Sequence, residues 1–110
     1  MSSPAAPVVL VESPAPGVRL LRLNRPEARN ALNLDVRTRL AAELAAAARD
    51  AGVRCVVLAG DERAFCAGGD IREMAGAGTV EMMQRGVLEL WRAIAACPKP
   101  VVAAVRGLAL

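Results

Sequence analysis

The stretch VRCVVLAGDERAFCAGGDIREM (residues 53–74) decides the fold. Its first part, VRCVVLAG (53–60), contains a continuous apolar run, as expected for a strand that is buried on both faces of a sheet. It ends with Asp70 and Glu73 in the D-x-x-E spacing of a capping box, which predicts a short helix from Ile71. A buried strand that leads through a loop into a helix is typical of α/β proteins, whose sites lie at the carboxyl ends of strands.

Two adjacent glycines, Gly68 and Gly69, stand directly before the predicted cap. Glycine tolerates positive φ and lets other atoms approach the backbone closely. Free N–H groups at such a turn, with a helix dipole behind them, bind an anion or an oxygen that becomes anionic during a reaction. The alternative is a tight turn that binds no ligand. Two glycines and an aspartate before a helix are common, so the pattern alone does not indicate a binding site. The residues by themselves leave both interpretations open.

The residues before this stretch predict a hairpin and a helix. VVLVE (8–12) and VRLLRLN (18–24) are β-like runs on either side of the turn SPAPG (13–17). A helix is expected from about Leu34 to Asp50, because apolar residues recur at helical spacing. Its apolar positions are Val36, Leu40, Leu44 and Ala47, with Arg37, Arg39 and Glu43 facing elsewhere and Asn33 as N-cap.

The residues after it predict a second helix and another buried strand. TVEMMQRGVLELWRAIAAC (79–97) carries one apolar face, and VVAAV (101–105) is a short apolar run. The resulting order of elements implies crossover connections and a parallel sheet. The apolar face of the second helix consists of Val80, Met83, Val87, Leu90, Trp91 and Ile94, with Glu81 and Glu89 exposed.

Composition fits one domain, residues 8–110, after a loose tail, residues 1–7. The 110 residues are 55% hydrophobic, and the net charge of +3 comes from scattered arginines with only 2% aromatics, so we expect no nucleic-acid partner. The three cysteines lack CxxC spacing, and no signal-peptide pattern or long apolar run occurs. We therefore expect a cytoplasmic protein with reduced thiols and no membrane partner.

Several kinds of chemistry are excluded or disfavoured. The sequence has no histidine, which excludes Ser-His-Asp and Cys-His machinery and His-based metal sites within it, so we expect no metal. Cys66 has mostly apolar neighbours and is interpreted as a packing residue. GAGT (76–79) lacks the Walker pattern and is interpreted as a linker between helices. The apolar end, VVAAVRGLAL (101–110), leads us to expect that the natural chain continues beyond it.

Four motifs together resemble the crotonase (enoyl-CoA hydratase/isomerase) superfamily. They are LNRPEARNALN (23–33), CVVLAG (55–60), AFCAGGDIREM (64–74) and KPVVAAVRGLAL (99–110), in the family's order and spacing. The resemblance implies an α/β fold of the ClpP/crotonase type, a superhelix of repeated ββα units, of which this sequence would be the N-terminal part. It also implies a CoA thioester as substrate, with no separate cofactor, and a homotrimer or hexamer for the full-length parent.

The resemblance assigns roles to residues of this sequence. In the family an A-G-x-D loop supplies one of two backbone N–H groups to the thioester oxygen, which makes the Gly69 amide the implied oxyanion donor. The carbonyl of Ala67 is implied to accept from the adenine amino group, and Arg29 and Arg72 lie where family members contact the CoA phosphates. The implied CoA-binding residues are Arg29, Ala31, Ala67, Gly68, Asp70, Ile71 and Arg72, with Met74 and Trp91 as candidate walls of the acyl pocket.

The motifs are most similar to those of enoyl-CoA hydratases of fatty-acid β-oxidation and aromatic-acid degradation, which convert trans-2-enoyl-CoA to 3-hydroxyacyl-CoA. The family's second oxyanion glycine and its two catalytic glutamates follow the last motif, so we expect these 110 residues alone to be an inactive fragment that folds poorly. An enoyl-CoA isomerase or another crotonase reaction is the first alternative. A non-catalytic acyl-CoA-binding or assembly module is the second. An unrelated nucleotide-binding domain is disfavoured, because no GxGxxG or P-loop is present.

Overall fold

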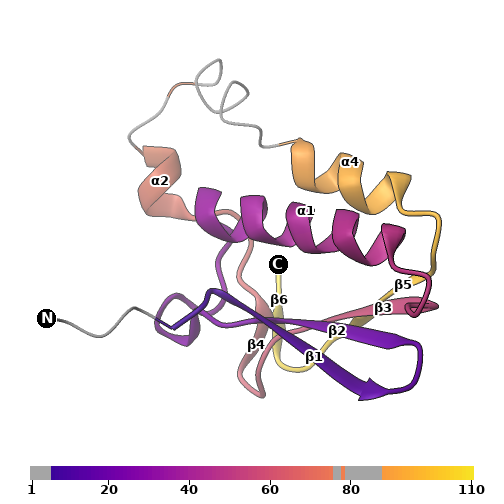
Figure 1. Ribbon diagram of the computed structural model, residues 1–110. Coiled ribbons are helices and arrows are strands. Elements are labelled where there is room, and N and C mark those ends of the chain that lie inside the picture. Colours follow the sequence, from indigo (N-terminus) through magenta and orange to yellow (C-terminus); the bar gives the residue numbers. More distant parts are fainter. Residues whose placement is uncertain (1–5, 76–77, 79–87) are drawn as a thin grey trace, which may run out of the picture.

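The computed structural model describes residues 6–75, 78 and 88–110. Its main sheet has four strands in the order β1-β2-β3-β5 (Figure 1). The antiparallel hairpin of β1 (Val9–Ala15) and β2 (Val18–Leu23) confirms the first pair of predicted strands. The strands β3 (Cys55–Ala59) and β5 (Val101–Ala104) then add in parallel, as the helical crossovers required.

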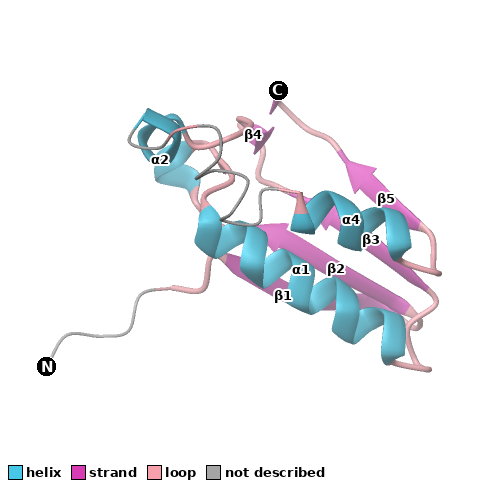
Figure 2. Cartoon of the chain, turned by 90° about the horizontal axis from the view of Figure 1, so that it is seen from above, coloured by secondary structure: helices cyan, strands magenta, loops and turns pink. Residues whose placement is uncertain are grey.

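Two helices cover one face of this sheet, α1 (Leu34–Arg49) and α4 (Glu89–Ala96), and they lie side by side (Figure 2). The Asn33 side chain caps α1 by accepting a hydrogen bond from the Val36 N–H at 2.9 Å, as predicted. The predicted apolar stripe of α1 is confirmed: Val36, Leu40, Leu44 and Ala47 are all buried. The stripe forms one core with strand residues such as Val9, Leu21 and Val56.

Three short elements were not predicted from the sequence: the 3-10 helix η1 (Pro26–Ala28), β4 (Ala64–Cys66) and β6 (Leu108–Ala109). The strands β4 and β6 pair in parallel as a second, two-stranded sheet. Runs this short show no periodicity, and their pairing depends on contacts between distant parts of the chain. One such contact is at Gly107, with φ of 68°, where a Cβ atom would collide with the Arg63 carbonyl oxygen.

The hairpin turn is tighter than predicted. β1 continues through Ser13 and Pro14 to Ala15, with a register irregularity between Glu12 and Ala15, and only Pro16 and Gly17 form the turn. Proline is tolerated here because β1 lies at the edge of the sheet, where a missing N–H breaks no ladder.

Two other expectations need correction or restriction. The strand β5 is not buried on both faces: Val101 packs against the core, but Val102 points to the face of the sheet that α1 and α4 do not cover and is 52% exposed. The helix expected over 79–97 is seen as α4 only. Its first part, residues 79–87 with Val80, Glu81, Met83 and Val87, lies outside the described residues, as do residues 1–5 of the expected tail. Glu89 is exposed, as expected. None of the helices in the described ranges is long and apolar enough to cross a membrane.

Candidate functional site

The A-G-G-D turn (67–70) is held against the segment that precedes α1. The Leu32 N–H donates to the Gly68 carbonyl at 2.7 Å, and the Asp70 N–H donates to the Leu32 carbonyl at 3.3 Å. These two bonds form an isolated parallel bridge between Leu32 and Gly69. In such a bridge the N–H of the central residue, Gly69, points away from the partner segment. Within the described residues it has no hydrogen-bond acceptor.

Position 68 requires glycine, because the backbone there has φ of 95°, which other residues rarely adopt. The next element, α2 (Ile71–Ala75), begins where the sequence predicts it. Asp70 is its cap, since Oδ1 accepts from the Arg72 N–H at 2.9 Å and from the Glu73 N–H at 3.3 Å. The strand–glycine turn–capped helix expected from the sequence is therefore present.

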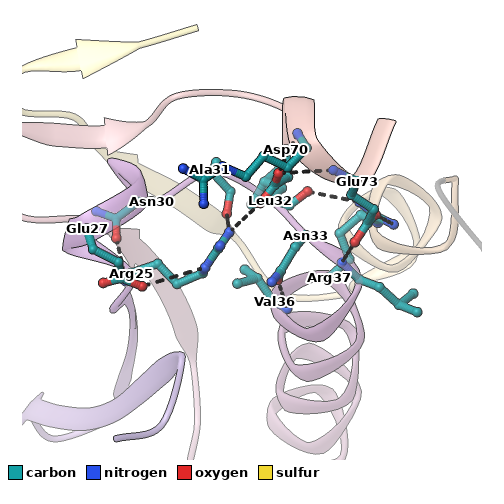
Figure 3. Close-up of polar contacts among 12 residues, drawn as sticks. Arg25, Glu27, Asn30, Ala31, Leu32, Asn33, Val36, Arg37, Asp70 and Glu73 are labelled. Atoms are coloured by element: carbon teal, nitrogen blue, oxygen red, sulfur yellow. Dashed lines mark hydrogen bonds and ion pairs between the residues drawn. The ribbon is translucent and has the colours of Figure 1, made fainter. Parts of the chain in front are cut away.

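Glu73 does not complete a capping box, which corrects the sequence interpretation. Its Oε2 accepts from the Leu34 N–H at 2.7 Å, and its Oε1 accepts from Arg37 Nη2 at 2.8 Å (Figure 3). The carboxylate thus serves the first turn of α1, where free N–H groups and the positive end of the helix dipole favour an anion. The buried guanidinium of Arg37 also binds this carboxylate, which favours its contact with α1 over a contact with the first turn of α2.

Arg37 does not face away from the core, as the helical pattern suggested. It is only 5% exposed and also donates from Nη1 to the Leu32 carbonyl at 2.9 Å. Arg25, which sequence reasoning missed, makes a similar contact: its Nη1 lies 2.8 Å from the Ala31 carbonyl and 3.0 Å from Asp70 Oδ2. Both arginines meet carboxylates far along the chain, so no local pattern signals either pair.

The two carboxyl groups of the turn are held in their charged form. Burial opposes this for Asp70, but hydrogen bonds from Arg25 and from the Glu73 and Arg72 N–H groups keep its pKa below the usual range. Burial likewise opposes the charge of Glu73, yet the Leu34 N–H and the Arg37 guanidinium lower its pKa. Both groups therefore act as anions that bind the backbone and arginines, and neither is poised to carry a proton at neutral pH.

Two hollows meet at Gly69. One is an apolar cavity of about 370 Å³ between the sheet and the helices. Its lining is Leu23, Leu32, Leu40, Leu58, Phe65, Cys66, Gly68, Gly69, Leu90, Trp91, Ile94 and Leu110. The other is a more polar groove of about 280 Å³. Its lining is Arg25, Glu27, Ala28, Ala31, Ala67, Gly69, Asp70, Ile71 and Arg72.

The structure brings most of the predicted site residues together. The groove gathers Ala31, Ala67, Asp70, Ile71 and Arg72 around Gly69, while Gly68 and Trp91 line the apolar cavity. Arg29 stands apart: it is exposed, has φ of 51°, and lines a neighbouring hollow with Asp61 and Arg63. Met74 belongs to α2, and its side chain lies outside the described residues, as does most of GAGT. The roles assigned to these residues stay predictions.

Cys66 has the surroundings of a packing residue. It is 7% exposed, and its Sγ accepts a hydrogen bond from the Gly68 N–H at 3.3 Å. Burial raises the pKa of this thiol, which disfavours the thiolate that a nucleophile needs.

Comparison with known proteins identifies relatives of the chain and of its fold. The chain is 46% identical over 93 residues to the "Probable enoyl-CoA hydratase" of Rhizobium meliloti (strain 1021), covering 84% of this chain and 36% of that protein. It is 43% identical over 101 residues to the 2,3-dehydroadipyl-CoA hydratase of Escherichia coli (strain K12), covering 92% and 40%. It is 39% identical over 99 residues to the 1,2-epoxyphenylacetyl-CoA isomerase of the same organism, covering 84% and 38%.

Solved structures of similar proteins have the same fold. The crystal structure of an enoyl-CoA hydratase from Bacillus anthracis superposes with a TM-score of 0.86 at 31% identity, covering 93% of this chain and 41% of that one. This confirms the predicted crotonase-type α/β fold. The chain spans 36% to 40% of the length of the curated relatives named above. The family model for enoyl-CoA hydratase/isomerase matches residues 14–110, and the chain belongs to that family.

Proposed function

We propose that the protein to which these residues belong is an enoyl-CoA hydratase, which adds water to a trans-2-enoyl-CoA to give a 3-hydroxyacyl-CoA. In this proposal the 110 residues bind the substrate and polarise its thioester carbonyl. The observation that carries the proposal is the N–H of Gly69, which has no acceptor within the described residues and lies where the apolar cavity meets the polar groove. The names of the two hydratase relatives support the reaction type.

The two hollows match the two ends of an acyl-CoA. An acyl chain suits the apolar cavity, and the nucleotide and pantetheine suit the groove, where Arg72 offers an exposed cation for a phosphate. The thioester between these ends then lies beside Gly69. A backbone N–H aimed at the oxygen that becomes negative during reaction contributes on the order of 2.7–4 kcal/mol of transition-state stabilisation. Such a donor needs no titratable group.

An enoyl-CoA isomerase is the second candidate, and the 39% identical isomerase relative favours it. Hydration and double-bond migration both place negative charge on the thioester oxygen, so the same amide serves either reaction. The two differ in the groups that move protons or activate water. None of the described residues that line the apolar cavity has a carboxylate side chain, so this part of the chain supplies binding and polarisation to both.

Binding tests the shared part of the proposal. Trp91 lines the apolar cavity, so crotonyl-CoA should change its fluorescence when it binds to the product of the complete reading frame that encodes these residues. Replacing Gly69 by proline removes the N–H, and Gly69→Ala is the matched control that keeps it. We expect Gly69→Pro to weaken binding of crotonyl-CoA about tenfold and Gly69→Ala to weaken it much less. Equal effects of the two substitutions would show that the amide does not bind the substrate.

Turnover tests the reaction type. The product of the complete reading frame that encodes these residues is assayed for loss of the enoyl-thioester absorbance and for migration of the double bond. Hydration of crotonyl-CoA supports the hydratase, and migration alone supports the isomerase. Binding without either reaction supports a non-catalytic acyl-CoA-binding module. We expect the 110-residue chain by itself to show no turnover, and hydration above background by that chain would contradict this.

A further inference from the structure

Within the described residues the Gly69 N–H makes no hydrogen bond of its own, so its direction depends on how the rest of the turn is held. The turn contains two glycines, one of them at positive φ, and glycine has the greatest backbone freedom of any residue. Two hydrogen bonds through Leu32, and one from the Ala67 N–H to the Arg29 carbonyl at 3.0 Å, join the turn to the segment beside it, and none of the three is made by Gly69 itself. A donor that stabilises charge must already be in position before reaction, so additional groups are needed to hold the turn.

Arg25 and Arg37 are such groups. We infer that they are positioning residues for the Gly69 amide, each joining one carbonyl of the pair Ala31–Leu32 to one carboxylate on the far side of the turn (Figure 3). Arg25 links the Ala31 carbonyl to Asp70, which directly follows Gly69. Arg37 links the Leu32 carbonyl to Glu73, one turn of α2 further on.

The chemistry of arginine suits this arrangement. A guanidinium is planar and always charged, so it can hold a carbonyl and a carboxylate at a fixed separation. The side chains of Arg25 and Arg37 are only 16% and 6% exposed, and those of Asp70 and Glu73 are 11% and 18% exposed. Charge-assisted bonds sheltered from water in this way are about twice as strong as neutral ones.

The two links act on opposite sides of the bridge. Leu32 is the residue whose N–H and carbonyl bind Gly68 and Asp70, and Arg37 binds that same carbonyl. Arg25 fixes Ala31 on one side and the Asp70 carboxylate on the other. Loss of either link lets the turn rotate relative to the Ala31–Leu32 segment, and the Gly69 N–H then loses its fixed direction into the two hollows.

The inference rests on the proposed function, and the test separates the two. Butyryl-CoA has a thioester carbonyl, whereas S-butyl-CoA is the thioether that lacks only that oxygen. The ratio of their dissociation constants, measured by calorimetry on the product of the complete reading frame that encodes these residues, reports the donors that face the thioester oxygen. Partial unfolding reduces the apparent affinity for both ligands by the same factor, so a purely structural defect leaves the ratio unchanged.

We expect the wild-type chain to prefer the thioester, and Arg25→Met and Arg37→Met each to reduce that preference about threefold to tenfold. Arg25→Lys and Arg37→Lys should restore part of it, because a lysine ammonium keeps the charge but not the planar fork. Arg22→Met is the matched control: Arg22 also joins a carboxylate, Glu12 at 2.8 Å, to a carbonyl, that of Gly60 at 2.9 Å, but does not touch the bridge.

The outcomes separate a failure of the proposed function from a failure of the positioning role. A wild-type chain without thioester preference overturns the proposed function itself. A wild-type preference that survives in the methionine variants, or that falls equally in Arg22→Met, overturns the positioning role. If a methionine variant binds neither ligand because it does not fold, the milder Arg25→Lys and Glu73→Gln replace it, and an unchanged ratio in both rejects the inference.

Discussion

Asn30 connects three parts of the site through one side chain. It is 1% exposed and has φ of 59°, in the left-handed region. Its Nδ2 donates to the Ala64 carbonyl of β4 at 2.9 Å, and its Oδ1 accepts from the Arg25 N–H at 2.8 Å. Asparagine is one of the few residues other than glycine that adopts this backbone conformation readily.

Replacing Asn30 by alanine should therefore be costly. The part-buried Arg25 N–H loses its acceptor, the Ala64 carbonyl keeps only the Asp61 N–H, and alanine is strained at this φ, so we expect the free energy of unfolding to fall by about 3 kcal/mol. Asn30→Gly should cost about 1 kcal/mol less, because it relieves only the strain. Urea unfolding measures both. Asn24→Ala removes an exposed hydrogen bond to the Pro7 carbonyl and is the control. Equal losses for Asn30→Ala and Asn24→Ala would contradict the argument.

The sequence indicates which residues cap helices more readily than which residues meet across the fold. Asn33 and Asp70 cap the helix that each directly precedes, so local spacing is enough to predict them. Arg25 meets Asp70 from 45 residues away, and Arg37 meets Glu73 from 36. Such pairs depend on how complete elements pack, and neither helical periodicity nor capping chemistry contains that information.

At the scale of elements, α2 is anchored to α1 by charge. Glu73 reaches the Leu34 N–H and Arg37, while Asp70 caps α2 and meets Arg25. α2 has only five residues, too few to be a stable helix in isolation. Its place in the fold therefore depends on these contacts, which require both carboxyl groups to be ionised.

This anchoring should depend on pH. The pKa of Asp70 and that of Glu73 are lowered in the fold, so their stabilisation is complete above the unfolded pKa values, about 4, and is lost as the pH falls through the folded values. We expect the free energy of unfolding to decrease from pH 5 toward pH 2, and to decrease less steeply in Glu73→Gln. Glu43→Gln, in an exposed i,i+4 pair with Arg39, is the control. A Glu73→Gln curve parallel to wild type would contradict the prediction.

Element length explains what the sequence could predict of the fold. The hairpin, α1 and β3 carry apolar patterns over several residues, and all three form, although β1 extends to Ala15 through part of the predicted turn. β4 and β6 have three and two residues, and they exist because they pair with each other. β5 was predicted to be buried because its residues are apolar, but burial depends on which faces of the sheet are covered, and composition does not reveal that.

At the scale of the whole molecule, three of the four most exposed large apolar residues of the described part lie in or near the C-terminal strands. Val102 is 52% exposed, Val105 53% and Leu110 83%. β5 pairs with β3 and has no partner on its other side within the described residues. It carries neither a charge nor a proline, the usual devices that keep an edge strand from pairing with another chain. β1, at the opposite edge, contains Glu12 and Pro14.

The 110-residue chain should therefore self-associate through β5. We expect sedimentation velocity to show a mass that rises with concentration, and Val102→Lys to shift the species toward monomer, because a charge on the edge opposes pairing. Leu34→Lys makes the same kind of change at a 42% exposed position on α1, away from that edge, and should leave association unchanged. A monomer at every concentration would show that the β5 edge does not pair. Equal effects of the two lysines would mean that net charge, and not the strand edge, controls association.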